Sequence, residues 1–246
     1  MNNWQKLKWL ILSGITESIG ERPVNRLEKT VGYETNKVEN TVSTEAKNIA
    51  DTFVEQAMIL ASQSKNLSEL YEKRSTFDGC PLKKTAAYTL NGYGSEHPDV
   101  LCLVEAPDTM DDREGKLIAG EVGVLLGKML GAIGLNLNQN AYVSSLIPWR
   151  PPGNRKPNST EHAVCRPFWE REIQLLQPKL LLLFGTGVSE ALLGISSLSK
   201  ARGAWHDYHG IPTRVSIPPA TLIKLSAQKK QAWEDLQQVQ AKLENL

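Results

Sequence analysis

The chain has 246 residues, of which 41% are hydrophobic and 22% are charged, and its net charge is +1. This composition is typical of a globular protein with one large core, and the near-neutral charge means that any basic binding surface must be local. The three cysteines are an odd, sparse set, which argues against a disulfide framework and for a reducing compartment. The N-terminal apolar run is too short to span a bilayer, so we expect a cytoplasmic protein without a membrane segment.

Four regions follow one another along the chain. Apolar residues at helical spacing predict a helix over 1–20, and the polar stretch over 21–43 lacks periodicity and is typical of a flexible linker. Residues 44–76 form a predicted helical segment, whose first helix spans about 45–63. The remaining residues, 77–246, are predicted to form one domain.

Within this domain, apolar runs alternate with helical patterns. The predicted strands are 99–107, 140–149, 180–185 and 213–220. The predicted helices are 120–135, 167–179, 187–194 and 226–246. The alternation predicts a three-layer α/β/α fold with a central, mainly parallel four-stranded sheet, preceded by an N-terminal helical extension.

Three loops leave the carboxyl ends of these strands, where the binding crevice of an open parallel sheet lies. They are "EAPDTMDDREG" (105–115), "PWRPPGNRKP" (148–157) and "IPPATLIK" (217–224). Their order, followed by "SAQKKQAWEDL", resembles the uracil-DNA glycosylase superfamily in its family-4 type. The N-terminal stretches "LSGITESIGERPVNR" and "FDGCPLKKTA" are similar to the form found in alphaproteobacterial members.

The resemblance implies base excision from DNA, with the target base flipped into a pocket. The chain departs from the family at the positions that carry this chemistry. Ser145 stands at the position of the base-reading Asn, Pro218 at that of the His that stabilises the leaving base, and Ile118 at that of the stacking Phe. Val104 and Asp108 replace two glycines. The positions that the resemblance assigns to the base pocket are Val104, Ala106, Pro107, Asp108, Ile118, Ser145 and Pro218.

Two carboxylates remain as catalytic candidates. Asp111 stands at the family's acidic position, and Glu105 belongs to the same loop. Asp111 also belongs to an acidic cluster with Asp108, Asp112 and Glu114, which supplies a general base or forms a solvated turn, and both interpretations stay open. Because several groups of the site are substituted, we expect ordinary uracil excision to be weak or lost. The alternative is a non-catalytic protein that binds single-stranded or damaged DNA, or a protein partner.

DNA is the partner that the resemblance implies, and two loops carry the candidate contacts. Arg150, Asn154 and Arg155 lie on a loop stiffened by prolines, where they either meet phosphates or pair with nearby carboxylates. Arg202 and Lys224 are further candidates, with solvated surface cations as the alternative. Leu222 and Ile223 stand where the family inserts an apolar wedge into the base stack. They either act as such a wedge or simply pack in the core.

The resemblance also locates an iron–sulfur site, whose four cysteine positions are Phe77, Cys80, Trp149 and Cys165 here. Two thiolates do not supply the four ligands that a cluster takes, so we expect no cofactor and no metal. His162 and Cys165 are three residues apart, a spacing that suits a metal, but without a second pair at ligand spacing we expect no metal site there. His206 and His209 precede the last strand and lie at the wrong end of it to replace the missing imidazole.

Overall fold

The computed structural model describes residues 38–246, and residues 43–246 form one compact unit. The predicted helix over 1–20 and most of the predicted linker over 21–43 lie outside the described residues. Helix α2 begins at Val38, so residues 38–43 of the linker range are helical. None of the helices in the described part of the chain has the length and apolarity needed to span a bilayer.

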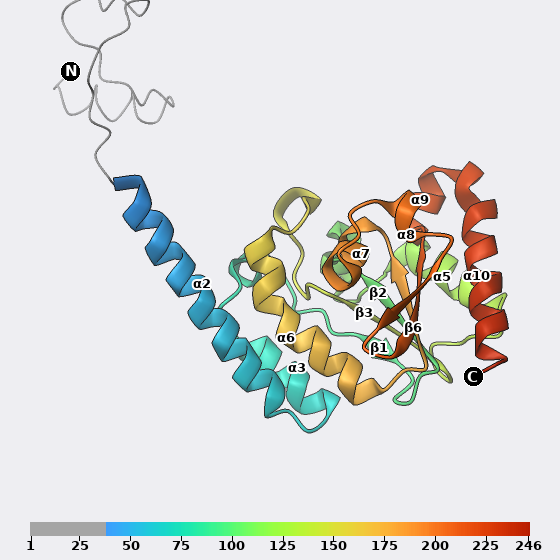
Figure 1. The fold of residues 1–246 in the computed structure, drawn as a ribbon, viewed down its shortest axis with the longest axis horizontal. Helices are drawn as coiled ribbons and strands as arrows, with labels where there is room; N and C mark the ends of the chain where they lie inside the picture. The colour runs from blue at the N-terminus through green and yellow to red at the C-terminus, as the bar shows by residue number, and fades with distance from the viewer. Residues whose placement is uncertain (1–37) are drawn as a thin grey trace, which may run out of the picture. The chain divides into compact units, whose positions relative to one another are not determined.

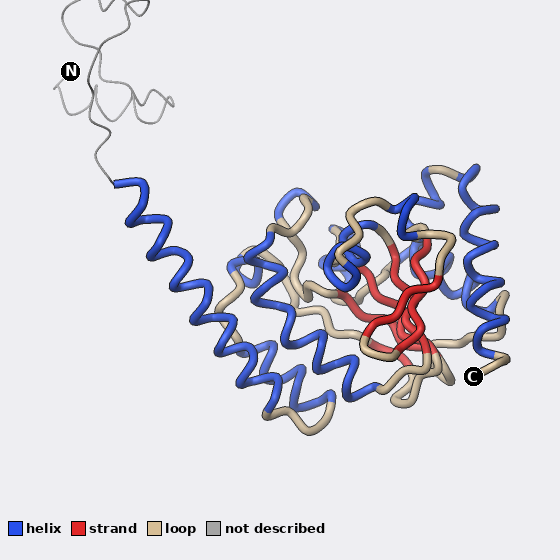
Figure 2. Tube along the Cα trace, viewed as in Figure 1, coloured by secondary structure: helices blue, strands red, loops and turns tan. Residues whose placement is uncertain are grey.

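A six-stranded sheet with the order β1-β3-β2-β4-β6-β5 forms the centre of the fold (Figures 1 and 2). The strands are β1 (Tyr93–Gly94), β2 (Val100–Val104), β3 (Ala141–Ser145), β4 (Leu180–Phe184), β5 (Trp205–Tyr208) and β6 (Ile211–Ser216). The four central strands are parallel, which confirms the predicted sheet. Two antiparallel edge strands, β1 and β5, were not predicted.

Helices cover both faces of this sheet. They are α2 (Val38–Ser62), α3 (Leu67–Thr76), α4 (Thr109–Glu114), α5 (Gly120–Gly131), α6 (Ser159–Leu176), α7 (Thr186–Leu193), α8 (Leu198–Ala201), α9 (Pro219–Lys224) and α10 (Lys229–Leu243). Short 3-10 turns are η1 (Pro81–Lys84), η2 (Pro152–Asn154) and η3 (Ser226–Gln228). Helix α6 starts earlier than predicted because Asn158 and Glu161 form a capping box at its N-terminus, and Pro167 lies inside it.

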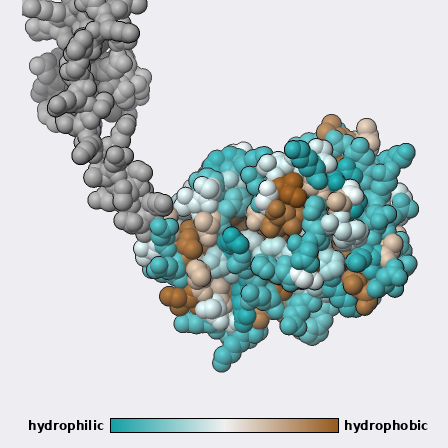
Figure 3. Space-filling view, viewed as in Figure 1, coloured by the Kyte–Doolittle hydropathy of each residue, from teal (hydrophilic) through white to brown (hydrophobic). Residues whose placement is uncertain are grey.

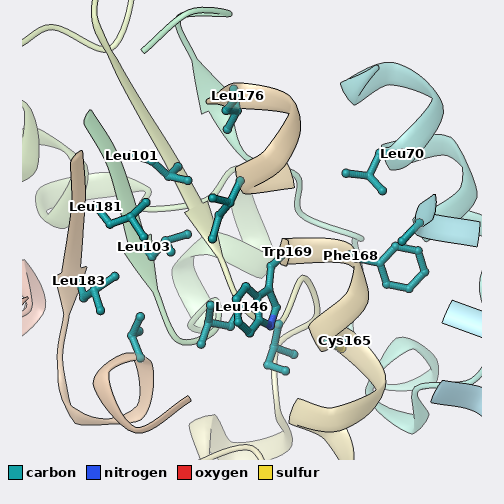
Figure 4. Packing of buried hydrophobic residues seen from close by; sticks show 14 of the residues in the cluster. Leu70, Leu101, Leu103, Leu146, Cys165, Phe168, Trp169, Leu176, Leu181 and Leu183 are labelled. Carbon is teal, nitrogen blue, oxygen red and sulfur yellow. The ribbon is translucent and has the colours of Figure 1, made fainter. Parts of the chain in front are cut away.

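Alternate residues of each central strand face opposite layers, as the period of a strand requires. Leu101 and Leu103 of β2 pack in a cluster with α3, α6 and α7, whereas Val100 and Cys102 pack in a second cluster with α5 and α10. Figure 4 shows Trp169 of α6 next to Leu146, and the leucines of β2 and β4 belong to the same cluster. The three-layer α/β/α architecture is therefore confirmed.

A buried polar cluster ties α3 and α6 to the sheet. The Glu172 carboxylate of α6 accepts hydrogen bonds from the hydroxyls of Tyr71 and Ser144, and it lies 3.4 Å from a guanidinium nitrogen of Arg74. Arg74 is 1% exposed and also donates to Asn91 at 2.6 Å. Because both charges are buried, each depends on the other for compensation.

We predict that Glu172→Gln lowers the free energy of unfolding by about 3 kcal/mol, since it leaves the Arg74 charge buried without a counter-ion. The matched control is Glu170→Gln on the same helix, where the carboxylate pairs with Arg166 at the surface. A surface pair at this spacing contributes roughly 0.3–0.5 kcal/mol. Urea unfolding of the two variants measures the difference, and equal losses would contradict the prediction.

Candidate functional site

A cavity of about 270 Å³ opens beyond the carboxyl ends of β2, β4 and β6, and we call it the crevice. A single nucleobase is smaller than the ligands that fill cavities of roughly 300–1,000 Å³, so this volume suits one base. The predicted site residues that line the crevice are Val104, Glu105, Ala106, Asp108, Asp111, Ile118 and Pro218. The structure thus brings most of the predicted pocket together at the edge of the sheet where such crevices lie.

Two predicted pocket residues do not line the crevice. Ser145, at the end of β3, is 1% exposed, and its hydroxyl donates to the carbonyl oxygen of Ile147 at 2.9 Å. Pro107 is buried and lines a smaller cavity of about 160 Å³ beside Asn154 and Arg155. Ser145 therefore closes a local turn and offers nothing to a ligand in the crevice.

Asp111 holds the loop between β2 and α5 in place. It forms a capping box with Asp108 at the start of α4, and its Oδ1 accepts the backbone N–H of Ala119 at 2.6 Å. Burial raises the pKa of Asp111, while the hydrogen bond from Ala119 acts in the opposite direction. The carboxylate is thus engaged by the backbone on both sides, which gives it a clear role in positioning the loop.

Ile118 reaches the crevice through an unusual backbone conformation. Its φ is +54°, a region that β-branched residues rarely adopt. The following helix has Gly123 next to this bend, and a Cβ at Gly123 would lie 2.2 Å from the Ile118 carbonyl oxygen. The glycine lets α5 approach the bend closely, so the side chain of Ile118 is directed into the crevice wall.

Glu105 lies against the first turn of α7. A Cβ at Gly187 would come within 2.0–2.3 Å of the Glu105 carboxyl group, so the absence of a side chain there allows this contact. Glu105 Oε1 is also 3.5 Å from Nε2 of His162. A carboxylate is stabilised at the N-terminus of a helix by the helix dipole, which accounts for this placement.

Lys156 was not predicted as a site residue, yet it lines the crevice, the cavity of about 160 Å³ and a third cavity of about 420 Å³ beside His162 and Arg166. Its side chain is exposed and has no ion-pair partner among the residues that the structure describes. The signal was its position directly after Arg155, on the same proline-rich loop. Thr186 and Gly187, which follow β4, also line the crevice. The sequence "FGTG" at the end of a buried strand was the available clue for these residues.

Arg150 and Arg155, both predicted to contact DNA, are paired with carboxylates. Arg150 Nε donates to Asp112 Oδ2 at 3.1 Å, and Asp112 is 6% exposed. Arg155 donates two hydrogen bonds, at 2.7 and 2.9 Å, to Glu161, which is 1% exposed. The sequence left open whether these arginines meet phosphates or pair with nearby carboxylates, and in this structure they pair with carboxylates. Asn154 accepts from Thr109 at 3.1 Å, which joins the same loop to α4.

The remaining DNA-contact candidates lie near α9 and α10, and some of them are engaged within the protein while others are exposed. Arg202 donates to the buried Asp235 at 2.7 Å and to the backbone carbonyl of Gln231 at 2.8 Å. Leu222 is 2% exposed and packs in the core, whereas Ile223 is 41% exposed. Lys224 is exposed at the end of α9. Leu222 is thus a packing residue in this conformation, and Ile223 and Lys224 are the side chains that face solvent.

The two histidines before the last strand take structural positions. His206 Nε2 lies 2.7 Å from the carbonyl oxygen of Ala201, and His209 packs edge-on against Tyr208. Neither residue lines the crevice.

The four positions of the family's iron–sulfur site lie in one buried cluster. The thiols of Cys80 and Cys165 are in contact. This hydrogen bond lowers the pKa of Cys80 and, together with burial, raises that of Cys165. Phe77 packs on Phe168 with ring centroids 5.3 Å apart, and Trp149 donates to the Thr89 hydroxyl at 2.9 Å. Two thiols and two packed rings do not fit a cluster that takes four thiolates. Among residues 38–246 no group of three or more metal-ligating side chains occurs, and the absence of a cofactor stays a prediction.

Comparison with known proteins identifies relatives of this fold. Residues 91–237 match the family model of the uracil DNA glycosylase superfamily. The type-4 uracil-DNA glycosylase of Pyrobaculum aerophilum is 30% identical over 128 residues, which is 52% of this chain and 65% of the relative. The enzyme of the same name from Archaeoglobus fulgidus is 26% identical over 158 residues, covering 62% and 79% of the two chains. The enzyme from Thermotoga maritima is 29% identical over 140 residues, covering 54% and 72%. The matched part thus spans 65% of the length of the Pyrobaculum relative.

We predict that the pairing of Glu161 with Arg155 makes stability depend on pH in the acid range. The hydrogen bond from Arg155 lowers the pKa of Glu161 below its ordinary value of 4.5, so the carboxylate stabilises the fold above that pH. The contribution is lost as the pH falls through the lower pKa of the folded state. The difference in free energy of unfolding between wild type and Glu161→Gln should be largest near neutral pH and shrink in acid. The exposed Glu114→Gln serves as control, and a difference that grows in acid would contradict the prediction.

Proposed function

Because the chain belongs to the uracil DNA glycosylase superfamily, we propose that it is a DNA-repair protein that binds DNA at an extruded base and excises uracil weakly or not at all. The observation that carries this proposal is the crevice. It keeps room for one base, but the walls at Pro218 and Ile118 offer no side-chain donor. The relatives named above are called uracil-DNA glycosylases, which supports DNA as the partner.

Excision requires that negative charge on the departing base be stabilised as the glycosidic bond breaks. Proline at 218 has neither a side-chain donor nor a backbone N–H. Three carboxylates, Glu105, Asp108 and Asp111, lie on the crevice walls, where they oppose a developing anion. Lys156 is the cation that lines the crevice, and its flexible side chain is exposed. The electrostatic environment therefore favours binding of a neutral base over release of an anionic one.

Base reading is also reduced. An asparagine amide pairs with a base edge as both donor and acceptor, whereas the hydroxyl of Ser145 is used by the carbonyl of Ile147. In addition, Ile118 supplies an aliphatic wall where the family has an aromatic ring. Contacts that depend on shape remain, and contacts that identify uracil by hydrogen bonds are missing from these two positions.

A second candidate function is a non-catalytic protein that binds single-stranded or damaged DNA, or a protein partner. Its supporting observation is that the crevice is lined by carboxylates and by Lys156, which has no ion-pair partner within residues 38–246. Binding to DNA that weakens steeply with salt would favour the DNA-binding class, since phosphate contacts release counter-ions. DNA affinity that is undetectable at low salt would favour a protein partner.

We predict that uracil excision is slower than that of an intact relative by at least about 10²–10³, the cost of losing one transition-state donor. The measurement is single-turnover cleavage of a uracil-containing single strand, followed by alkaline treatment. The Thermotoga maritima enzyme in the same assay is the reference. Turnover by this protein within a few-fold of the reference would contradict the proposal.

We predict that restoring the family residues restores activity. The variant with Pro218→His, Ser145→Asn and Ile118→Phe regains an imidazole, an amide and a ring, and excision should rise about 10²-fold or more. The matched control has Pro218→Ala with the same two other changes, which returns the backbone N–H but no imidazole. A folded triple variant that excises no faster than this control would refute the idea that the scaffold is retained.

A further inference from the structure

The surface formed by α9, η3 and the first turns of α10 exposes large apolar side chains beside lysines. Ile223 is 41% exposed, Leu225 51% and Trp233 40%. Figure 3 shows hydrophobic residues at the upper edge of the molecule, in the region of α9 and the start of α10. Exposed apolar side chains that gather in one place mark binding surfaces more often than scattered ones do. We define the α9–α10 surface as Ile223, Lys224, Leu225, Lys229, Lys230 and Trp233.

Lys229, Lys230 and Trp233 lie on the same face of helix α10. Lys229 and Lys230 precede Trp233 by four and three residues, a spacing that places side chains on one helical face. The opposite face of the helix packs Ala232 and Leu236 into the core. The indole and the two ammonium groups therefore project together into solvent.

The charge of this surface is positive. Lys224, Lys229 and Lys230 are all exposed. The nearby carboxylate of Asp235 is buried and is compensated by Arg202 and Arg214, at 2.7 and 3.0 Å. Between residues 219 and 237, Glu234 is the exposed carboxylate that opposes the three lysines. The net positive charge of this surface therefore favours an anionic partner.

The α9–α10 surface begins at the mouth of the crevice. Pro219 and Ala220, the first residues of α9, line the crevice wall, and Ile223 and Leu225 follow within two turns. A strand that left an extruded base on this side would pass over α9 toward α10. The position of the surface thus matches the path of a chain of nucleotides that starts in the crevice.

We propose that the α9–α10 surface binds single-stranded DNA next to the crevice, with Trp233 stacked on a base and the lysines in contact with phosphates. Aromatic stacking combined with cations is how proteins hold single strands without reading sequence, because every base has a flat face. Apolar exposure alone would suit a protein partner equally well, but the three lysines favour a polyanion. The inference rests on the proposed DNA-binding function and is independent of excision.

The test is the affinity of the full chain for fluorescein-labelled oligothymidylate without uracil, measured by anisotropy. Trp233→Ala should weaken binding roughly tenfold, as expected for the loss of one stacked base, and Trp233→Phe should retain most of the affinity. Binding should also quench tryptophan fluorescence in wild type, and this quenching should diminish in Trp233→Ala. The control is Met58→Ala, which removes another exposed apolar side chain from α2.

The lysines are tested through the salt dependence. Lys229→Gln with Lys230→Gln should reduce the slope of log affinity against log salt by about 1.4, because each contact to a single-strand phosphate contributes about 0.7. Lys65→Gln with Lys84→Gln makes the same change in net charge at exposed positions far along the chain and should leave the slope unchanged.

Wild-type affinity that Trp233→Ala leaves unchanged would overturn this inference while the proposed function stands. No measurable binding of uracil-containing or uracil-free strands by the wild type would overturn both. A slope that falls equally in both double-lysine variants would also refute the inference, since it would reflect net charge and not this surface. Urea unfolding of each variant establishes that a lost affinity does not come from a lost fold.

Discussion

Buried carboxylates that need counter-ions determine how this protein holds its loops. Asp112, Glu161 and Asp235 are nearly or fully buried, and each accepts a hydrogen bond from an arginine of a loop beside the sheet or its crevice. Removing the arginine of such a pair leaves a buried carboxylate without compensation, which destabilises the fold more than the loss of a surface pair does. Arg150 and Arg155 therefore stabilise the fold through their ion pairs with Asp112 and Glu161. Any contact that they make with DNA has to compete with an existing ion pair.

These pairs also fix the shape of the crevice. The loop over 150–155 is bound to α4 through Asp112 and to the start of α6 through Glu161, and the loop before α5 is held by the carboxylate of Asp111. Because these carboxylates act on the backbone and on arginines, the walls keep their positions without help from a catalytic group. Substitutions at positions such as Pro218 and Ile118 change the chemistry of the crevice and leave its frame in place.

Strands β2 and β4 were predictable because they are buried on almost their whole length and form continuous apolar runs, whereas β3 and β6 carry polar residues and were predicted from their alternation with helices. The edge strands were not, since β1 has two residues and β5 (Trp205–Tyr208) is half exposed and carries polar side chains. Sequence order located the crevice, because the ends of parallel strands meet at one edge. It did not reveal that Arg202 pairs with Asp235, since the two residues are 33 positions apart and the pairing depends on packing.

Sequence order likewise predicts where the site residues lie, but it does not predict which hydrogen bonds they make. Motif order identifies which loops surround the crevice, and it places Ser145 at a base-reading position. In the structure the hydroxyl of Ser145 bonds to the carbonyl of Ile147, a bond within the turn that needs no ligand to satisfy it. A buried polar group with its own partner gains nothing from a bound base. Selection of a ligand then falls to other side chains of the crevice wall, among them the ammonium group of Lys156, which favours an anionic strand nearby.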